Sequence, residues 1–408
     1  MKLLQINNTV NSGSTGRIAE EIGLKAIKAN YESYIAAANT SRPSKSKIIQ
    51  IGNVSDLKMH GLKTRLLDRH GFGSAKATKE LVSTMEQLNP DLIHLHNIHG
   101  YYLHIRILFE YLKKHQKAVV WTFHDCWPFT GHCSYFDAVD CFKWQTECNH
   151  CPNMKGYPAS WGLDQSKRNF HDKREIFNGL NTLQIITPSK WLSNHVNISF
   201  LSSYPVKVIY NGIDLKAFRP NRSDKGILSK YKLSKNPVLL GVASIWDKRK
   251  GLDDFKKISQ LIDKKYQIVL VGLKKTQISN LPDNIRGIER TENVEELAAL
   301  YSAAAVFVNP TYVDNFPTTN IEALACGTPV ITYNTGGSPE AIDENTGKVV
   351  EKGNVESLAK EIEKIIEKGK EHYRPLCRAR AEQFFNKDDR YQDYLKIYEQ
   401  LILQNTTT

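Results

Sequence analysis

One strand–loop–helix–strand stretch in the second half of the chain constrains its fold most. Ala305–Pro310 (AVFVNP) is an apolar run typical of a buried strand, and a helix-forming segment follows at Asn320–Cys326. Gly327–Pro329 ends that helix, Val330–Tyr333 reads as the next strand, and Gly336-Gly337 supplies a tight turn. A strand followed by a helix and a second strand predicts a parallel sheet covered by helices.

The start of this helix is predicted to bind a phosphate and a polyol together. The first N–H groups of a helix lack intrahelical partners and carry positive partial charge, which suits a phosphate. Thr318, Thr319 and Asn320 bracket this end, and two acidic residues, Asp314 and Glu322, flank it. Glu322, just inside the helix, is placed to accept hydrogen bonds from sugar hydroxyls. The stretch therefore predicts a nucleotide-sugar site.

The spacing of Asp314 and Glu322, an acid-x7-acid pair, resembles the donor-site signature of the family-4 retaining glycosyltransferases, as do the Gly-Thr-Pro stop and the GGSPE turn. The resemblance implies the GT-B fold, in which two doubly wound α/β domains face each other across a cleft. It implies that Glu322 holds the nucleotide ribose and that Asp314, where the family usually has Glu, faces the donor sugar. Without the resemblance, an ordinary core unit with a solvated aspartate fits the same residues.

The resemblance extends to further donor-side positions. Lys250 matches the family's diphosphate-binding lysine, but Ser244 stands where the family has arginine. Either Arg249 supplies the second charge, or Lys250 acts with backbone dipoles alone. The expected catalytic residues are His124, Lys250 and Asp314. The expected donor-binding residues are Gly13, Gly16, Arg249, Lys250, Val294, Phe316, Pro317, Thr318, Thr319 and Glu322.

In the first half, the loop Asn8–Gly16 lies between a predicted strand and a predicted helix. Its Gly13 and Gly16 are candidates to present backbone N–H groups to a diphosphate, the alternative being simple turn glycines.

Histidines follow two predicted strands of the first half. The resemblance places His124, in WTFHD, against the donor sugar, with Asp125 as an orienting partner. His96 and His99 are predicted to meet the acceptor, because ligands of open α/β sheets lie at the carboxyl ends of strands.

Five of the seven cysteines fall between residues 126 and 151. Disulfides are rare in the cytosol, so a cysteine cluster there favours metal or redox chemistry. Cys133, Cys141, Cys148 and Cys151 have the spacing C-x7-C-x6-C-x2-C, which fits a structural zinc site of four thiolates. His132 and His150 are alternative ligands. Uncoordinated thiols and a disulfide are the alternatives to metal binding.

Positive charge is concentrated in the first half. Residues 1–211 hold 25 Lys/Arg and 16 Asp/Glu (+9) and the remainder 30 and 27 (+3), which gives the net charge of +12. No nucleic-acid motif accompanies this charge, so an anionic membrane surface or a diphosphate-linked acceptor is the better partner. The segment 56–79 fits either a membrane-surface helix or an ordinary surface helix. Its leucines are Leu62, Leu66 and Leu67, and the basic residues among them are Lys63, Arg65 and Arg69.

We expect an acceptor-side domain at residues 1–206, joined by a C-terminal helix at 386–408, and a nucleotide-sugar domain at 207–385. The absence of a secretory leader and of an apolar run of the ~18–20 residues that span a bilayer predicts a cytoplasmic protein, peripheral at the inner face of the plasma membrane.

The block HDCWPFTGHC…CNHCPNMKGYP also resembles bacterial glycosyltransferases of colanic-acid or capsule type. The resemblance implies retaining transfer from a UDP- or GDP-sugar to a polyprenyl-diphosphate-linked or oligosaccharide acceptor, without a catalytic metal. The alternatives are a nucleotide-sugar epimerase, a sugar phosphorylase, or an inactive nucleotide-sugar-binding scaffold.

Overall fold

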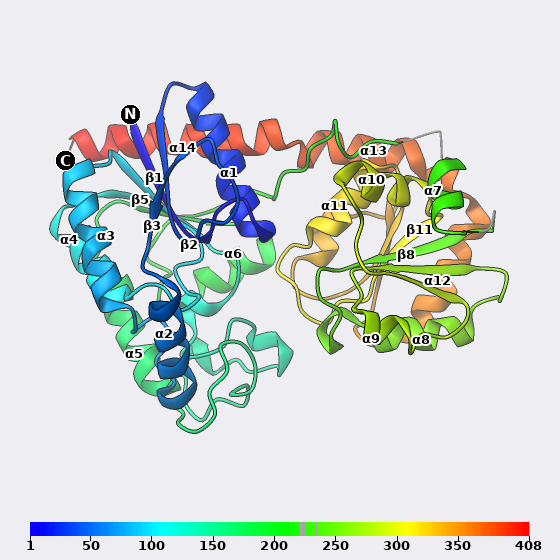
Figure 1. Cartoon of the computed structure of the whole chain (residues 1–408), viewed down its shortest axis with the longest axis horizontal. Helices are drawn as coiled ribbons and strands as arrows, with labels where there is room; N and C mark the ends of the chain where they lie inside the picture. Colours follow the sequence, from blue (N-terminus) through cyan, green and yellow to red (C-terminus); the bar gives the residue numbers. More distant parts are fainter. Residues whose placement is uncertain (221–224, 234–235, 408) are drawn as a thin grey trace. The chain divides into compact units, whose positions relative to one another are not determined.

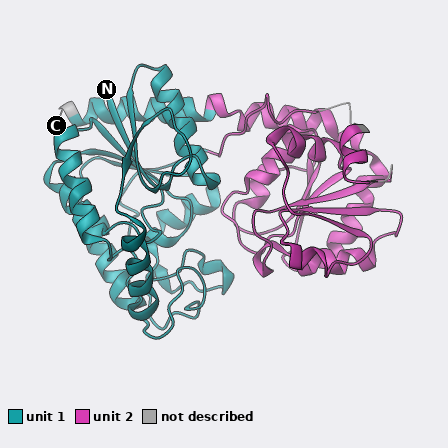
Figure 2. Ribbon diagram, viewed as in Figure 1, with its two compact units in different colours: residues 1–209, 390–408 teal, residues 210–389 magenta. Residues whose placement is uncertain are grey.

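The computed structural model describes residues 1–220, 225–233 and 236–407, and it divides into two compact units (Figures 1 and 2). Unit 1 contains Met1–Ile209 and Arg390–Thr408, and unit 2 contains Tyr210–Asp389. The sequence analysis placed these boundaries at residues 206 and 385. Each unit has one parallel sheet with helices packed against it, which confirms the expected α/β class.

Unit 1 is built on a seven-stranded sheet in the order β3-β2-β1-β4-β5-β6-β7, with every neighbouring pair parallel. The strands are β1 (Lys2–Thr9), β2 (Glu32–Asn39), β3 (Lys47–Gln50), β4 (Leu92–Leu95), β5 (Ala118–Thr122), β6 (Leu183–Thr187) and β7 (Val206–Val208). The helices are α1 (Gly13–Lys28), α2 (Val54–Leu67), α3 (Ala75–Leu88), α4 (Ile105–Lys114), α5 (Ser166–Phe177), α6 (Lys190–Asn197) and, from Arg390 onward, α14 (Lys387–Thr407). Tyr394 and Tyr398 of α14 are buried in the core of this unit.

Unit 2 is built on a six-stranded sheet in the order β10-β9-β8-β11-β12-β13, again parallel throughout. The strands are β8 (Val238–Val242), β9 (Gln267–Val271), β10 (Ile285–Ile288), β11 (Val306–Asn309), β12 (Val330–Tyr333) and β13 (Gly347–Val350). The helices are α7 (Lys225–Lys230), α8 (Leu252–Leu261), α9 (Lys275–Ile278), α10 (Val294–Ala303), α11 (Thr318–Ala325), α12 (Val355–Lys368) and α13 (Lys370–Phe385). Strands such as β11 are buried along their whole length, because helices cover both faces of a parallel sheet.

The strand order reverses once in each sheet, between β1 and β4 in unit 1 and between β8 and β11 in unit 2. Loops that leave the two strands at such a point turn toward opposite faces, and ligands of open α/β sheets bind in the crevice that they leave. In unit 2 these loops are residues 243–251 and 310–317. The fold therefore brings the two parts of the predicted donor signature to one place within unit 2.

Helix α2 carries three of its four leucines, Leu62, Leu66 and Leu67, on the outside, while Leu57 packs against the core of unit 1. The buried residues of α2 are His60, Gly61 and Thr64. His60 Nε2 accepts hydrogen bonds from the backbone N–H groups of Gly71 and Gly73, each at 3.2 Å. Leu62 and Leu66 are 43% and 49% exposed. An ordinary amphipathic surface helix buries its leucines instead, so α2 presents an apolar face to solvent.

The segment between β5 and α5 has little regular structure. Residues 126–165, all of them described, contain only three short 3-10 turns, at Trp127–Phe129, Phe136–Ala138 and Lys143–Gln145. Four of its large side chains are nonetheless packed inward, Trp127, Phe129, Phe136 and Trp144 being at most 1% exposed, whereas Phe142 and Trp161 are exposed. Among the helices that the structure describes, none has the length and apolarity to cross a bilayer.

Candidate functional site

The predicted donor signature of unit 2 centres on an ion pair at the reversal of the sheet. Lys250 ends a 3-10 turn, Lys248–Lys250, in the loop after β8, and Asp314 lies in the loop after β11. The Lys250 ammonium lies 2.5 Å from Asp314 Oδ2, and each side chain is 18% exposed. A partly exposed cation at this position can exchange its carboxylate partner for a phosphate.

Further contacts fix the loop that carries Asp314. The Arg249 guanidinium donates to the carbonyl of Val313 at 3.1 Å, so this cation braces the loop. Gly336 has φ of +52°, and a Cβ there would lie 1.7 Å from the carbonyl oxygen of Asp314. The Gly337 N–H donates to the carbonyl of Asn315 at 2.9 Å. The Gly-Gly turn of the signature is therefore required for the close approach of two loops.

Helix α11 begins at Thr318, two residues earlier than predicted, because Pro317 takes the N-cap position with φ of −68°. No described side chain caps it, and Thr318 and Thr319 form its first turn. Asn320, predicted as a capping residue, is fully buried instead and donates to Ser338 Oγ at 3.0 Å. The N–H groups of the first turn of α11 therefore have no side-chain cap, which is the feature on which the predicted anion site depends.

Glu322 lies on the first turns of α11 and is 7% exposed. The buried Tyr301 hydroxyl donates to Glu322 Oε2 at 2.9 Å. Burial and the nearby Glu322 carboxylate raise the pKa of Tyr301 well above its ordinary value, so this hydroxyl remains a donor. Tyr301 was not among the predicted site residues, and it fixes the carboxylate that the resemblance assigns to the ribose.

The loop that leads into α10, residues 291–294, ends at the predicted donor-binding residue Val294 and is also held in place. Asn293 caps α10 by accepting from Glu296 N at 2.8 Å, and Glu296 Oε2 accepts from Glu292 N at 2.6 Å. Lys230 lies 2.6 Å from Glu296 Oε1. Val294 begins α10 and is 39% exposed. A nucleotide base bound beside Val294 would contact a loop that these hydrogen bonds and the ion pair hold in place.

Phe316 is 4% exposed, and its ring stacks on Tyr210 with a centroid separation of 5.1 Å. Its side chain is therefore part of the core of unit 2. A donor contact at this position would involve the backbone.

In unit 1 the loop after β1 depends on Gly16. A Cβ on Gly16 would lie 2.6 Å from Thr9 Oγ1, and the Asn11 N–H donates to the carbonyl of Gly16 at 3.2 Å. Gly13 is exposed, has φ of +65° and has open space around it. Gly16 therefore closes the loop, and Gly13 leaves room for a ligand.

A chain of hydrogen bonds determines the tautomer of His124. The Gln5 amide donates to the carbonyl of Ala19 at 2.9 Å, so its Oε1 is the atom that accepts from His96 Nε2 at 3.0 Å. Neutral His96 then presents a proton-free Nδ1 to His124 Nε2 at 3.3 Å. His124 therefore carries its proton on Nε2, and Nδ1 is the basic atom of its ring. Burial lowers the pKa of His124 to about 4, which keeps the ring neutral at neutral pH.

Asp125 was expected to orient His124, but its carboxylate contacts His99 and the backbone of Trp127 instead. Asp125 Oδ2 lies 2.9 Å from His99 Nε2, and its Oδ1 accepts from the Trp127 N–H at 2.9 Å. The ring contact of His124 is with His96, the centroids being 5.5 Å apart. His96 and His99 are 1% and 6% exposed. This burial favours supporting roles for them over the direct acceptor contact that the sequence suggested.

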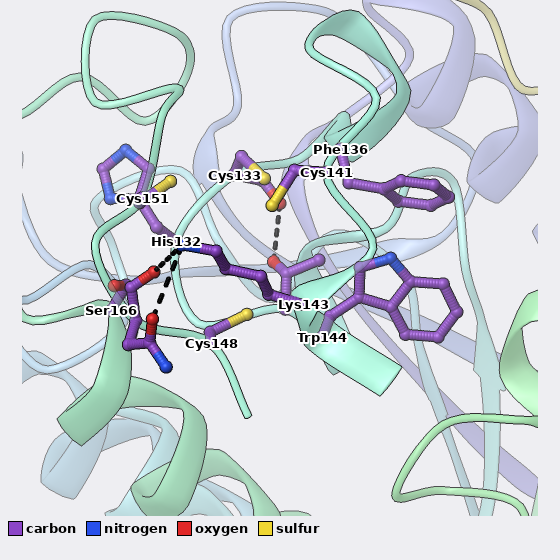
Figure 3. A pocket seen from close by; sticks show the side chains of 11 residues that line it. His132, Cys133, Phe136, Cys141, Lys143, Trp144, Cys148, Cys151 and Ser166 are labelled. Atoms are coloured by element: carbon purple, nitrogen blue, oxygen red, sulfur yellow. Dashed lines mark hydrogen bonds between the residues drawn. The ribbon is translucent and has the colours of Figure 1, made fainter. Parts of the chain in front are cut away.

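Four of the clustered cysteines, Cys133, Cys141, Cys148 and Cys151, line one small pocket of unit 1 (Figure 3). The pocket has a volume of about 10 Å³, room for about one water molecule, and His132 also borders it. All seven cysteines of the chain are free thiols. Across the described residues, no group of three or more His, Cys, Asp or Glu side chains is arranged so that it could hold a metal ion.

Two family models match the chain. The model described as "Glycosyltransferase Family 4" matches residues 15–217, and the model described as "Glycosyl transferases group 1" matches residues 236–368. The two matches cover most of both units.

Individual proteins agree with these matches. WcaC of Escherichia coli K12, assigned to colanic acid biosynthesis as a glycosyl transferase, is 26% identical over 384 residues, which is 88% of this chain and 89% of WcaC. The capsular polysaccharide biosynthesis glycosyltransferase CapM of Staphylococcus aureus is 29% identical over 38% of this chain and 43% of CapM.

Solved structures of glycosyltransferases share the fold over the whole chain. Sucrose-phosphate synthase of Thermosynechococcus elongatus superposes with a TM-score of 0.72 at 19% identity and covers 99% of both chains. Anabaena HepE, solved in complex with UDP, superposes with a TM-score of 0.67 at 16% identity and covers 98% of this chain and all of HepE.

Proposed function

The chain belongs to the family-4 glycosyltransferases of GT-B fold, and from this premise we propose a retaining sugar transfer. The donor is a UDP- or GDP-sugar, and the acceptor is a polyprenyl-diphosphate-linked or oligosaccharide chain. The relatives WcaC and CapM suggest exopolysaccharide or capsule synthesis as its role.

The observation that carries the proposal is the Lys250–Asp314 pair at the sheet reversal of unit 2, beside the start of α11. A cation and a helix N-terminus together suit a diphosphate, and a carboxylate that can separate from the cation suits the hydroxyls of a sugar. Glu322, fixed by Tyr301, is placed for the ribose hydroxyls. These three elements match the three parts of a nucleotide-sugar.

The reaction follows from this arrangement. The bond between the sugar C1 and the diphosphate oxygen breaks while Lys250 and the α11 N–H groups stabilise the negative charge that develops on the leaving phosphate. The acceptor oxygen forms its bond to C1 on the same face, and its hydroxyl proton passes to the leaving phosphate oxygen. Retention follows because attack and departure share one face. Activity should not depend on added Mg²⁺ or Mn²⁺.

Unit 1 supplies features that suit a lipid-linked acceptor. A groove of about 610 Å³ runs along α2 and is lined by apolar side chains that include Met59, Leu62 and Leu66, a volume in the usual range of ligand pockets. Lys58 and Arg65 are exposed on the same helix. Leucines beside cations are typical of helices that lie on anionic membranes. We therefore place the protein at the inner face of the plasma membrane.

The function is tested with purified full-length protein and a panel of UDP- and GDP-sugars, with and without polyprenyl-diphosphate-linked sugars. We expect one donor to release its nucleoside diphosphate, faster with acceptor, and the product to keep the anomeric configuration of the donor. Glu322→Gln should abolish most of this release. Conversion of the donor without an acceptor would indicate an epimerase, dependence on free phosphate a phosphorylase, and binding without turnover an inactive scaffold.

A further inference from the structure

We propose that Cys133, Cys141, Cys148 and Cys151 bind one zinc ion, which pins the irregular segment between β5 and α5. The proposal concerns a structural site in unit 1 and does not rest on the transferase reaction. Four thiolates in a closed tetrahedral site are a common set for structural zinc. A segment of this length without helices or strands generally needs a staple of some kind.

The four thiols are neighbours in space although they span 19 positions of sequence. They line one pocket whose volume is about 10 Å³, which suits a single ion better than an organic ligand. Cys148 and Cys151 are separated by two residues, and both border this pocket together with Cys133 and Cys141. Figure 3 shows the four side chains around this common space.

The backbone around the pocket already supports sulfur ligands. The Gly131 N–H donates to Cys148 Sγ at 3.2 Å, the kind of N–H···S contact that stabilises a metal thiolate. A Cβ on Gly131 would lie 2.7 Å from the Cβ of Cys148 and 2.1 Å from the carbonyl oxygen of Ser166. Glycine is therefore needed for this close approach of the loop to a proposed ligand.

The buried His132, which borders the pocket, is hydrogen-bonded to a carboxylate, as histidines at metal sites often are. His132 Nδ1 lies 2.5 Å from the buried Asp68 carboxylate. A carboxylate can only accept a hydrogen bond, so His132 Nδ1 carries the proton and donates. The Nε2 atom is then proton-free, and it is buried with no hydrogen-bond partner among the described residues. Carboxylate–histidine pairs of this type recur around zinc. His132 is thus the reserve ligand of the site, next to Cys151.

Two lysines lie near the negative charge that four thiolates and one Zn²⁺ would leave. The buried Lys173 amine donates to the carbonyls of Trp127 and Thr130 at 2.7 and 3.0 Å, just before Cys133 in the chain, and burial lowers the pKa of Lys173 to about 7. Lys143 borders the pocket itself and donates to the carbonyl of Asn149 at 3.0 Å. A net negative metal site inside a protein is favoured by such neighbours.

Zinc binding requires the thiols to move. Because no group of three or more His, Cys, Asp or Glu side chains in the described structure is arranged so that it could hold a metal ion, the cysteine side chains must turn toward a common centre when zinc binds. Each thiol that binds gives up its proton to solvent, so four protons are released per ion if all four bind as thiolates.

The experiment measures metal in the full-length protein purified without chelators, by elemental analysis. We expect about one zinc per chain, in keeping with a single four-thiolate site. Replacement by Co²⁺ should give the visible absorption of a tetrahedral thiolate site together with an intense thiolate-to-cobalt charge-transfer band. Both readouts use the wild-type chain and do not require a folded variant.

Variants then assign the ligands. Cys148→Ser and Cys151→Ser should lose most of the zinc, whereas Cys126→Ser, in the same segment but outside the pocket lining, and Cys326→Ser, in unit 2, should keep it. His132→Gln should also keep it. Zinc-free wild-type protein with reduced or disulfide-linked cysteines would overturn the proposal, and loss of zinc in His132→Gln would overturn the four-cysteine ligand set.

Discussion

The Lys250 ammonium lies 2.5 Å from the Asp314 carboxylate, although the two residues are 64 positions apart in the chain. The contact is possible because the strands that precede them, β8 and β11, are neighbours at the reversal of the unit 2 sheet. A donor diphosphate bound there would compete with Asp314 for Lys250. The pair therefore links donor binding to the release of a carboxylate beside the sugar.

Replacing Lys250 by methionine should lower kcat by about 10²–10³, the usual loss when one charge-stabilising group is removed from a transition state. The measurement is initial-rate kinetics with the donor found by screening. Lys248→Met is the matched control, because Lys248 lies in the same 3-10 turn and is exposed. Equal rates for the two variants would show that Lys250 does not stabilise the transition state.

Replacing Tyr301 by phenylalanine should raise the KM for the donor about 5-fold and leave kcat nearly unchanged. The change removes only the hydrogen bond to Glu322, worth about 1 kcal/mol, and loosens the carboxylate assigned to the ribose. Tyr333→Phe is the control, since the Tyr333 hydroxyl also donates to a carboxylate, Asp254, at 3.0 Å. If both variants change KM alike, the effect is one of general packing.

The sequence predicted the strand, loop and helix around the proposed donor site because these elements are local. Strand, loop and helix of residues 305–325 follow one another directly, so spacing alone places Asp314 and Glu322 near the start of α11. The partners of these residues come from elsewhere. Tyr301 is 21 positions from Glu322, and an isolated tyrosine in a predicted helix gives no sign of which carboxylate it will meet.

Unit 1 shows a different limit of prediction. The sequence places Asp125 next to His124, yet the carboxylate contacts His99 because the turn at Trp127 directs it away. His94 and His96 are two positions apart at the end of β4, and their ring centroids are 4.0 Å apart, as the alternation of side chains along a strand requires. The polar inner face of α2 could not be predicted, because periodicity assigns leucines to the core.

Replacing Gln5 by methionine should lower the transfer rate several-fold, because it removes the acceptor that fixes His96 and through it His124. The discriminating readout is the ¹⁵N spectrum of the labelled histidines, in which His124 should change from the Nε2–H form to a tautomer mixture. Thr122→Val is the control, because it breaks the bonds to His94 Nε2 and to the Tyr394 hydroxyl but none to His96. An unchanged His124 spectrum in Gln5→Met would contradict the relay.

Acidification should destabilise unit 1 through its buried histidines. Burial lowers the pKa of His60 to about 3 and the pKa values of His94 and His96 well below 6.5. The unfolded chain binds protons at these rings near pH 6.5 and the folded chain does not. The free energy of unfolding therefore falls below that pH, by up to about 1.4 kcal/mol per pH unit for each such histidine.

The measurement is the Tm of unit 1, followed by tryptophan fluorescence between about pH 7.5 and about pH 5. In this range the imidazoles of the unfolded chain take up protons. His60→Gln keeps an oxygen acceptor near the Gly71 and Gly73 N–H groups but cannot titrate. Its Tm should decline less steeply with acid than that of the wild type. Parallel declines would show that His60 makes no contribution.

Replacing Leu62 and Leu66 by aspartate should abolish sedimentation with anionic phospholipid vesicles. The two leucines are 43% and 49% exposed on α2, and burying half of such a side chain in lipid contributes about 1 kcal/mol, so loss of both with added negative charge lowers binding at least tenfold.

The basic residues to reverse are Lys58 and Arg65, both exposed. Arg69 is unsuitable, because it pairs with Asp172 at 2.7 Å.

The matched control for this substitution is Val349→Asp, since Val349 is 44% exposed on β13 of unit 2. It introduces one of the two negative charges of the double variant, at a similar exposure on the other unit, and should leave vesicle binding intact. Thermal denaturation of all variants separates a lost membrane contact from a lost fold. Because Leu62 and Leu66 of α2 make few core contacts, the variants' Tm should stay close to that of the wild type, and vesicle binding that survives in Leu62→Asp/Leu66→Asp would show that the acceptor reaches the protein by another surface.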